Sequence, residues 1–392
     1  MLKCNEDMVI SLTGIPHTIS KNNVKIFGWS GKHATRLIVL LQNCDLRVSA
    51  PEDNDNSSNL GRLIMSIARR GMLALVGALG IGAMVASAPG VAHAWEPKKP
   101  VEFVIMAGQG GGAVKMARLM QAVIEKNGWS SKPLTPINKP GGSGAEALVH
   151  LQGKADSDPN HTIMVTLNSF YTTPMRQPGL GVDIATFTPI ARMAEDTFLL
   201  WVHKDSGITN IEEFVAAAKA AGKDWVMAGT GKLQEDQLLT DFLNAAYGLE
   251  MKYVPYKGGG KVAKQLAGQH ANSTVNNPSE QEGFYASGDT VPLAAFTLDR
   301  LEMFPDAPTF KELGQDFVYF MQRSVVGAPG MSDEAAAYYR DLFQKVYDSE
   351  DWQTYRKKKS LYGDFLSGQA LMDYWMNERE IHKAMLTEMG AL

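Results

Sequence analysis

Cysteine is nearly absent from this sequence: Cys4 and Cys44 are the only two in 392 residues. This scarcity excludes a disulfide framework and any zinc site built from several cysteines. An excess of one charge is also missing, because 38 Lys and Arg stand against 42 Asp and Glu, a formal net charge of −4. We therefore expect no nucleic-acid partner bound by a strongly basic face. Hydrophobic residues make up 45% and charged residues 20%, which excludes disorder, collagen and coiled coil as the main architecture, and the length predicts two or three domains.

Charged residues are missing from one long run, residues 71–92. Two arginines precede the run, and the small-x-small box Ala92-His93-Ala94 follows it. This order is typical of a secretory signal peptide, which we assign to residues 65–94, with cleavage after Ala94. Residues 1–64 are then expected to be a non-native upstream extension without ordered structure. The alternative is a cytoplasmic extension with the apolar run as a membrane anchor, since the run is long enough to span a bilayer.

Removal of residues 1–94 leaves a chain with 29 basic and 36 acidic residues, a net charge of −7, and no cysteine. A cysteine-free exported chain suits an oxidising compartment. It also has no thiol nucleophile and no thiolate metal ligand.

Strand and helix patterns alternate through the remaining chain. Strands are predicted at 101–106, 134–138, 161–167, 225–228, 251–256, 271–276 and 291–297, and extended stretches at 192–203 and 320–328. Helices are predicted at 114–126, 145–152, 211–221, 234–247 and 262–268, and almost throughout 333–388. This rhythm indicates an α/β fold with parallel sheets in two lobes. Ligands of such folds lie outside the carboxyl ends of the strands, so we expect a cleft there.

Three glycine-rich turns, at 108–113, 141–145 and 229–231, each follow a strand and precede a helix. Glycine lets the backbone approach a ligand closely, and the free N–H groups at the helix start then point at it. The helix dipole makes such an end an anion site. Three converging turns therefore predict a small ligand with one or more carboxylates. The competing interpretation is that they are merely tight turns, because glycine is the default turn residue.

The sequence contains no complete motif for catalysis or for cofactor binding. The first turn fits G-x-G-x-x-A, the dinucleotide fingerprint, but no acidic residue ends a clear second strand about 20 positions on. No G-x-S-x-G or H-E-x-x-H motif occurs, and no His or Asp partner is indicated for the loop serine Ser143. The histidines after residue 94 are scattered along the chain. We therefore assign no catalytic residue, no cofactor and no metal.

Five segments carry a family resemblance. They are GGGAVKMARL (110–119), NKPGGSGAEAL (138–148), VPYKGGGKVAKQLAGQHANSTVNNP (254–278), FPDAPTFKELG (304–314) and GAPG (327–330). In this order they resemble the extracytoplasmic substrate-binding receptors of tripartite tricarboxylate transporters, the Bug family. The resemblance implies a periplasmic binding protein-like (Venus flytrap) fold, with two α/β lobes joined by two hinge crossovers. One lobe would comprise about 95–198 with 321–392, and the other about 199–320.

The resemblance also implies a set of ligand-binding positions. In this sequence they fall on Gly110, Gly111, Gly112, Ala113, Gly142, Ser143, Gly144, Asn168, Ser169, Gly229, Thr230, Gly231, Gln234, Glu235, Asn276 and Asn277. Three positions depart from the family pattern. Ala113-Val114 stands where many members have Thr-Asp, Glu235 where many have His, and Arg323 at a tryptophan position. Arg323 could bind a ligand carboxylate, but we favour an ion pair with a Glu or Asp at the hinge, because arginine commonly serves in buried ion pairs.

The implied function is a soluble, monomeric periplasmic receptor, not an enzyme. It would capture a small carboxylate, such as a di- or tricarboxylate or an aromatic carboxylate, by lobe closure. It would deliver this ligand to a transporter with two integral-membrane subunits. The alternative is an exported α/β hydrolase that uses Ser143 or Glu235.

Overall fold

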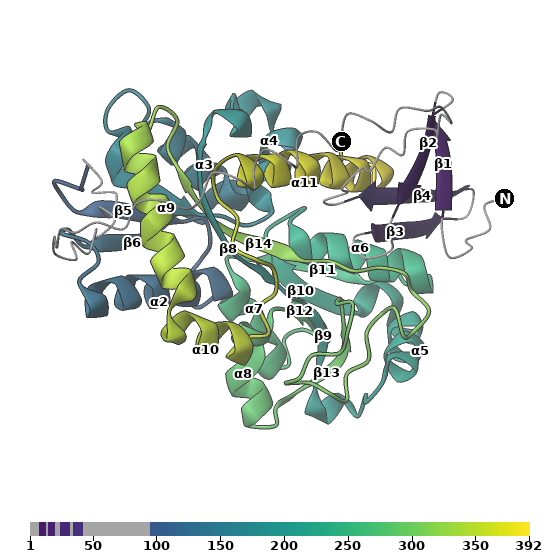
Figure 1. Cartoon of the computed structure of the whole chain (residues 1–392). Helices are drawn as coiled ribbons and strands as arrows, with labels where there is room; N and C mark the ends of the chain where they lie inside the picture. Colours follow the sequence, from purple (N-terminus) through teal and green to yellow (C-terminus); the bar gives the residue numbers. More distant parts are fainter. Residues whose placement is uncertain (1–7, 13–14, 20–23, 32–33, 42–94) are drawn as a thin grey trace, which may run out of the picture. The chain divides into compact units, whose positions relative to one another are not determined.

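The computed structural model describes residues 8–12, 15–19, 24–31, 34–41 and 95–392 (Figure 1). In the N-terminal part, β1 (Met8–Leu12) pairs with β2 (Ile15–Ile19) in an antiparallel hairpin, and β3 (Val24–Gly31) pairs with β4 (Ala34–Leu41). The signal peptide predicted at 65–94 lies outside the described residues, and the upstream extension stays a prediction. Of the helices in the described ranges, none combines the length and the apolar character that crossing a membrane requires.

The first lobe is built on a five-stranded sheet. Its strand order is β6 (Leu134–Asn138), β5 (Val101–Ile105), β7 (Thr162–Val165), β14 (Met321–Gly327) and β8 (Thr188–Asp196). β5 runs parallel to β6 and β7, whereas β14 runs antiparallel to β7 and β8. Four of the five β5 residues are fully buried, as expected of a central strand that is covered on both faces.

The second lobe is built on another five-stranded sheet. Its order is β11 (Lys252–Tyr256), β10 (Val226–Thr230), β12 (Ser273–Asn276), β9 (Leu199–His203) and β13 (Thr290–Ala295). β10 is parallel to β11 and β12, and β9 is antiparallel to β12 and β13. The lobe boundaries given above stay a prediction, but the strands of the two sheets come from 101–196 with 321–327 and from 199–295.

Both sheets are mixed, so the prediction of parallel sheets is wrong in part. The extended stretch predicted at 192–203 is two strands, β8 and β9, which belong to different sheets and are separated by two residues. The chain thus leaves one sheet and enters the next without a helix between them. It returns to the first lobe through β14. The strands β8, β9 and β14 are therefore not joined by the strand–helix–strand crossover that makes neighbouring strands parallel.

Helices flank both sheets. In the first lobe they are α2 (Gly112–Asn127), α3 (Ala145–Gln152) and α4 (Ser169–Arg176); in the second they are α5 (Ile211–Ala221), α6 (Glu235–Tyr247), α7 (Gly259–Ala267) and α8 (Pro278–Ala286). The five helices predicted before residue 270 are confirmed to within three residues at each end. The sequence did not indicate α4, which has a proline inside it, or α8, whose buried residues are Pro278, Ser279 and Gln281 rather than an apolar stripe.

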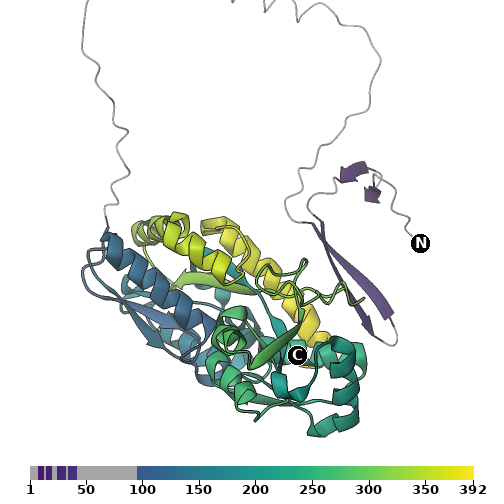
Figure 2. The same ribbon diagram turned by 90° about the horizontal axis from the view of Figure 1, so that it is seen from below.

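The C-terminal region returns to the first lobe. It forms α9 (Asp333–Asp348), α10 (Glu350–Lys358) and α11 (Gly368–Glu388), and both α9 and α11 pack against β8. In Figure 2 these helices, yellow-green to yellow, lie beside the blue elements of the first lobe. The fully buried Trp375 of α11 donates from Nε1 to Oε1 of Gln322 on β14, at 2.8 Å. This bond ties the last helix to the strand that leads into the pocket described next.

Candidate functional site

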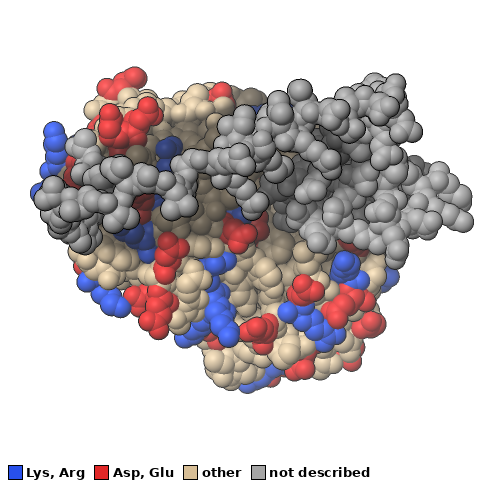
Figure 3. Space-filling model, in the orientation of Figure 1, with Lys and Arg blue, Asp and Glu red and all other residues tan. Residues whose placement is uncertain are grey.

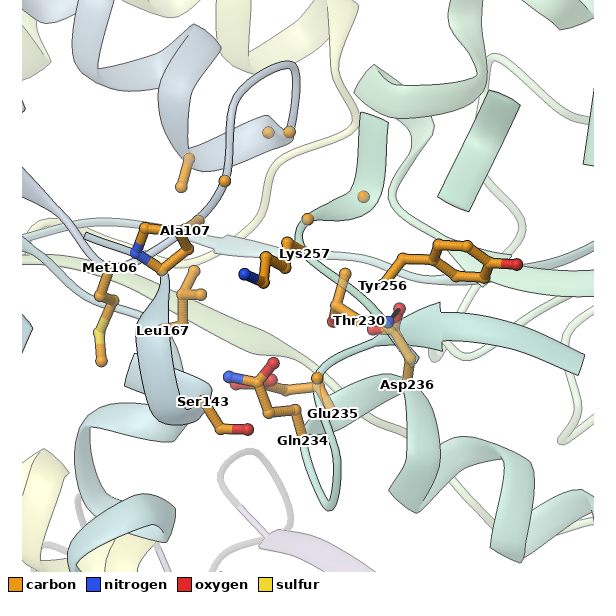
Figure 4. A pocket seen from close by; sticks show the side chains of 18 of the residues that line it. Met106, Ala107, Ser143, Leu167, Thr230, Gln234, Glu235, Asp236, Tyr256 and Lys257 are labelled. Atoms are coloured by element: carbon orange, nitrogen blue, oxygen red, sulfur yellow. Dashed lines mark hydrogen bonds between the residues drawn. The ribbon is translucent and has the colours of Figure 1, made fainter. Parts of the chain in front are cut away.

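A cavity of about 360 Å³ lies where strands of both sheets end. Its wall includes residues that directly follow β5, β11 and β12, namely Met106, Lys257 and Asn277. Thr230 at the end of β10 and Leu167 beyond β7 complete this set. These are the carboxyl ends of the parallel strands, where α/β folds bind ligands. Figure 4 shows side chains from both lobes facing the same space.

Eleven of the seventeen residues singled out from the sequence line this cavity. They are Gly111, Gly112, Ala113, Gly142, Ser143, Thr230, Gly231, Gln234, Glu235, Asn277 and Arg323. Six others are not part of its wall: Gly110, Gly144, Asn168, Ser169, Gly229 and Asn276. A ligand contact for any of these residues stays a prediction.

Asn168 illustrates why some of these positions lie behind the wall. Its side chain is fully buried, donates to the backbone oxygen of Phe320 at 2.9 Å and accepts from the backbone nitrogen of Gln322 at 2.9 Å. It therefore fastens the end of β7 to the start of β14. Gly229 is similarly enclosed, because a Cβ there would lie 2.5 Å from Tyr253 Oη and 2.6 Å from Asp236 Cβ.

Fourteen further residues line the cavity that are not among these seventeen, although Gly108 and Gly141 belong to the glycine turns predicted at 108–113 and 141–145. They are Met106, Ala107, Gly108, Pro140, Gly141, Leu167, Asp236, Pro255, Tyr256, Lys257, Gly258, Gly259, Glu280 and Met321. A signal existed for the run 255–259, which lies inside the segment VPYKGGG. No comparable signal marked Asp236 or Glu280, because an acidic residue in the first turn of a helix is common on dipole grounds alone.

The backbone N–H groups of the glycine turns are bound by the chain's own carboxylates. Gly112 N, at the start of α2, donates to Glu280 Oε1 at 3.1 Å. Gly141 N, in the second turn, donates to Glu146 Oε2 at 2.9 Å, and Thr230 N, in the third, donates to Asp236 Oδ2 at 2.7 Å. Each turn therefore has an N–H group that donates to a carboxyl oxygen, as an anion site does. These particular N–H groups, however, are not free for a ligand as we had expected.

Glu280 is held by the second lobe and reaches the first. It forms a capping box with Asn277 at the start of α8. Its Oε2 accepts from Asn276 Nδ2 at 2.8 Å and from Asn277 N at 3.3 Å, while Oε1 accepts from Gly112 N across the cavity. A Cβ at Gly259 would lie 2.0 Å from Glu280 Oε1, so this glycine is required for the carboxylate to sit where it does. Glu280 thus has a fixed position in the pocket wall.

A second acidic side chain also crosses between the lobes. Glu235 begins α6 in the second lobe, and its Oε1 accepts from the backbone nitrogen of Ser169, the first residue of α4, at 2.9 Å. Glu235 is only 2% exposed and Asp236 3%. Burial raises the pKa of Glu235, against hydrogen bonds to its own and Ser169 backbone N–H groups. Burial, reinforced by the charge of Glu280, raises the pKa of Asp236 well above its ordinary value.

Arg323 forms a buried ion pair and does not project as a free cation. Its Nε lies 2.9 Å from Asp196 Oδ2, and Nη2 donates to Asn277 Oδ1 at 3.0 Å. Both partners of the ion pair are 2% exposed. Asp196 ends β8, just before the chain crosses to the second lobe. The structure therefore has the pairing with a hinge carboxylate that we favoured from the sequence.

Ser143 makes no contact of the kind that a nucleophile needs. Its Oγ donates to the backbone oxygen of Lys232 at 3.2 Å, and no His, Asp or Glu side chain of the described residues accepts from it. Within residues 95–392, no three His, Cys, Asp or Glu side chains are grouped so that they could hold a metal ion. On the face shown in Figure 3, acidic and basic side chains are interspersed.

The raised pKa of Asp236 predicts a specific pH dependence of stability. In the unfolded chain this carboxyl ionises near its ordinary value of about 3.9, whereas in the folded protein it stays protonated to a higher pH. The unfolded state therefore releases the proton first, and the free energy of unfolding falls as the pH rises between these two values. Asp236→Asn removes this loss. We expect its melting temperature, relative to wild type, to increase as the pH rises above about 4.

Thermal unfolding of both proteins across that pH range measures the effect. Asp306→Asn, a matched change at an exposed position of the same lobe, should show a difference from wild type that is independent of pH. A constant offset for Asp236→Asn as well would mean that its carboxyl is ionised in the folded protein.

Two α/β lobes with a pocket at their facing strand ends define the class of two-lobed solute-binding proteins. Residues 126–390, more than half of the chain, match the family described as tripartite tricarboxylate transporter family receptor. The chain belongs to this family. Among curated proteins it is 25% identical to the UPF0065 protein in the gbd 5' region of Cupriavidus necator. The match extends over 324 residues, which are 83% of this chain and 97% of that protein.

Two solved structures show the same fold. The periplasmic binding protein BugD matches with a TM-score of 0.69 and 20% identity, over 75% of this chain and 99% of that one. A Rhodopseudomonas palustris protein solved with adipate matches with a TM-score of 0.67 and 21% identity, over 75% of this chain and 98% of that one. The predicted periplasmic binding protein-like fold and the predicted family are thereby confirmed.

Proposed function

We propose that this protein is a periplasmic receptor that captures a small organic carboxylate between its lobes and presents it to a membrane transporter. The observation that carries the proposal is the cavity at the junction of the two sheets, which both lobes line. Family membership supports a receptor role, and the fold is shared with a protein solved with adipate. The ordered pocket, rather than a reactive group, is the feature that this function requires.

Lobe closure is the step that would report capture. Hydrogen bonds that cross between the lobes include those from Gly112 N to Glu280, from Ser169 N to Glu235 and from Ser143 Oγ to the Lys232 carbonyl. A ligand that contacts both walls binds the closed state more tightly than the open one, so it shifts the population towards closure. The transporter would then read the closed form. No bond of the ligand is made or broken.

A thermal-shift screen of the purified protein tests this function. The probes are di- and tricarboxylates, aromatic carboxylates and acidic amino acids. A ligand present at 100 times its dissociation constant should add about 2.7 kcal/mol to the free energy of unfolding. Mass spectrometry of the recovered ligand should find it unchanged. No shift with any carboxylate would contradict the receptor function, and recovery of a hydrolysed product would favour the hydrolase alternative.

A further inference from the structure

The pocket wall has one cation without an ion-pair partner. Three carboxyl groups line the cavity, Glu235, Asp236 and Glu280, together with two basic side chains, Lys257 and Arg323. Burial raises the pKa of Glu235 and of Asp236, so these two add less negative charge than their number suggests. Arg323 is already paired with the buried Asp196, so of the described residues in the wall Lys257 is the one cation that no carboxylate holds in an ion pair. A ligand with a second carboxylate would place it near Glu280 with no free cation of the wall beside it, which is costly where water is excluded.

The two kinds of charge occupy different parts of the cavity. Lys257 follows β11 and is exposed, so it stands at the mouth, and Figure 4 shows its ammonium group directed into the pocket. Glu235 and Asp236 are buried at the start of α6, on the opposite side in the same view. A free cation therefore stands at the mouth, and carboxyl oxygens that can accept hydrogen bonds lie at depth. This separation favours a ligand that has a negative and a positive end.

Glu280 decides which group can approach the start of α2. Its carboxylate already accepts the Gly112 N–H that a ligand carboxylate would otherwise use. Its other two hydrogen bonds come from Asn276 and Asn277 of its own lobe. An ionised carboxyl group has about four acceptor sites, so three donors leave it able to accept one more. A ligand that carries a hydrogen-bond donor can occupy this remaining site.

We infer that the pocket selects a bipolar ligand, a carboxylate that carries a primary ammonium group at its other end, and that Glu280 is the residue that sets this specificity. Lys257 binds the carboxylate end at the mouth. Glu280 and Glu235 accept hydrogen bonds from the ammonium end at depth. This inference rests on the proposed receptor function and narrows its ligand class from small carboxylates in general to amino-terminated ones.

Matched ligand pairs test the inference. Glutarate and 4-aminobutyrate have similar lengths and differ in one terminal group, as do adipate and 5-aminopentanoate. Isothermal titration of the wild-type protein should show tighter binding of the amino member of at least one pair, by roughly tenfold or more, since like charges face each other only in the dicarboxylate complex. Glu280→Gln should reduce this ratio at least tenfold, by weakening the amino compound, improving the dicarboxylate, or both.

The control is Glu250→Gln, which makes the same charge change at an exposed position outside the pocket wall. It should leave the ratio at its wild-type value. Because Glu280 also caps α8, the melting temperature of Glu280→Gln is measured alongside. Lys257→Gln, at an exposed side chain, is the second variant. It should weaken both members of a pair while leaving their ratio unchanged.

Each outcome has a distinct meaning. Tighter binding of the dicarboxylates by the wild-type protein, or a Lys257→Gln variant with unchanged affinities, would overturn the inference and leave the receptor function standing. A ratio unaffected by Glu280→Gln in a folded variant would overturn the role of Glu280. If no carboxylate of any kind binds the folded wild-type protein, then the receptor function itself fails.

Discussion

Arg323→Met lowers the free energy of unfolding by about 3–5 kcal/mol, because it leaves the Asp196 carboxylate buried without its partner. The two side chains are 2% exposed, and the guanidinium Nε and Asp196 Oδ2 are 2.9 Å apart. The loss is larger than that of a surface pair because the remaining charge has no water to solvate it. For a chain of this size, this corresponds to a fall in melting temperature of roughly 10 °C, which differential scanning calorimetry measures directly.

Arg379→Met serves as the matched control. Arg379 pairs with Glu380 at 3.0 Å, but these side chains are 36% and 57% exposed, so the change should cost no more than about 1 kcal/mol. The double variant Asp196→Asn with Arg323→Met should recover part of the stability, because it removes the stranded charge. Equal shifts for Arg323→Met and Arg379→Met would show that the Asp196 pair contributes no more than a surface contact.

Gly108→Ala should reduce ligand affinity on the order of 100-fold, which corresponds to about 2.8 kcal/mol. Gly108 follows β5 in the first lobe, and a Cβ there would lie 2.0 Å from the backbone oxygen of Lys257 in the second lobe. The backbone of Gly108 is not in the left-handed region, so alanine is tolerated locally. The clash exists only when the lobes meet. We therefore expect both lobes to fold normally while closure is blocked.

Titration of a ligand found in the screen, together with small-angle scattering of the ligand-saturated protein, checks this result. The variant should stay more expanded than the wild type at the same ligand excess. Gly283→Ala is the control, because a Cβ at that α8 position meets nothing within 4 Å. Wild-type affinity in Gly108→Ala would mean that binding does not need the close approach of Gly108 and Lys257.

Much of the fold could be predicted because its signals are local. The boundaries predicted for the helix at 211–221 match α5, and its predicted N-cap is confirmed: Asn210 Oδ1 accepts from Glu213 N at 2.9 Å. The glycine turns also lie at the strand ends where they were expected. The family resemblance placed the boundary between the lobes at 198/199, inside the stretch 192–203. The mixed direction of the sheets could not be predicted, because nothing in that stretch indicates the direction in which its two strands pair.

The residues of the candidate site also fall into two groups, those that the sequence indicated and those that it did not. The glycine turns were found because turn residues have recognisable neighbours in the sequence, whereas Gln234 and Glu235 were named because the family resemblance implied them. Asp236 and Glu280 were not found, although they and Glu235 give the pocket its acidic character. Their sequence context is that of ordinary acidic residues in the first turn of a helix. The burial of Asp236, and hence its raised pKa, follows from packing alone.

By itself, the sequence determined the order of strands, turns and helices and the presence of N–H groups able to hold carboxylates. These properties depend on residues within a few positions of each other. The N–H groups of Gly141 and Thr230 hold nearby side chains, those of Glu146 and Asp236, but only the tertiary structure decided the distant partners. Gly112 and Glu280 are 168 positions apart, and Asp196 and Arg323 are 127 apart. Such partners are chosen by how two sheets and their helices pack, and a buried charge takes the partner that packing brings within reach.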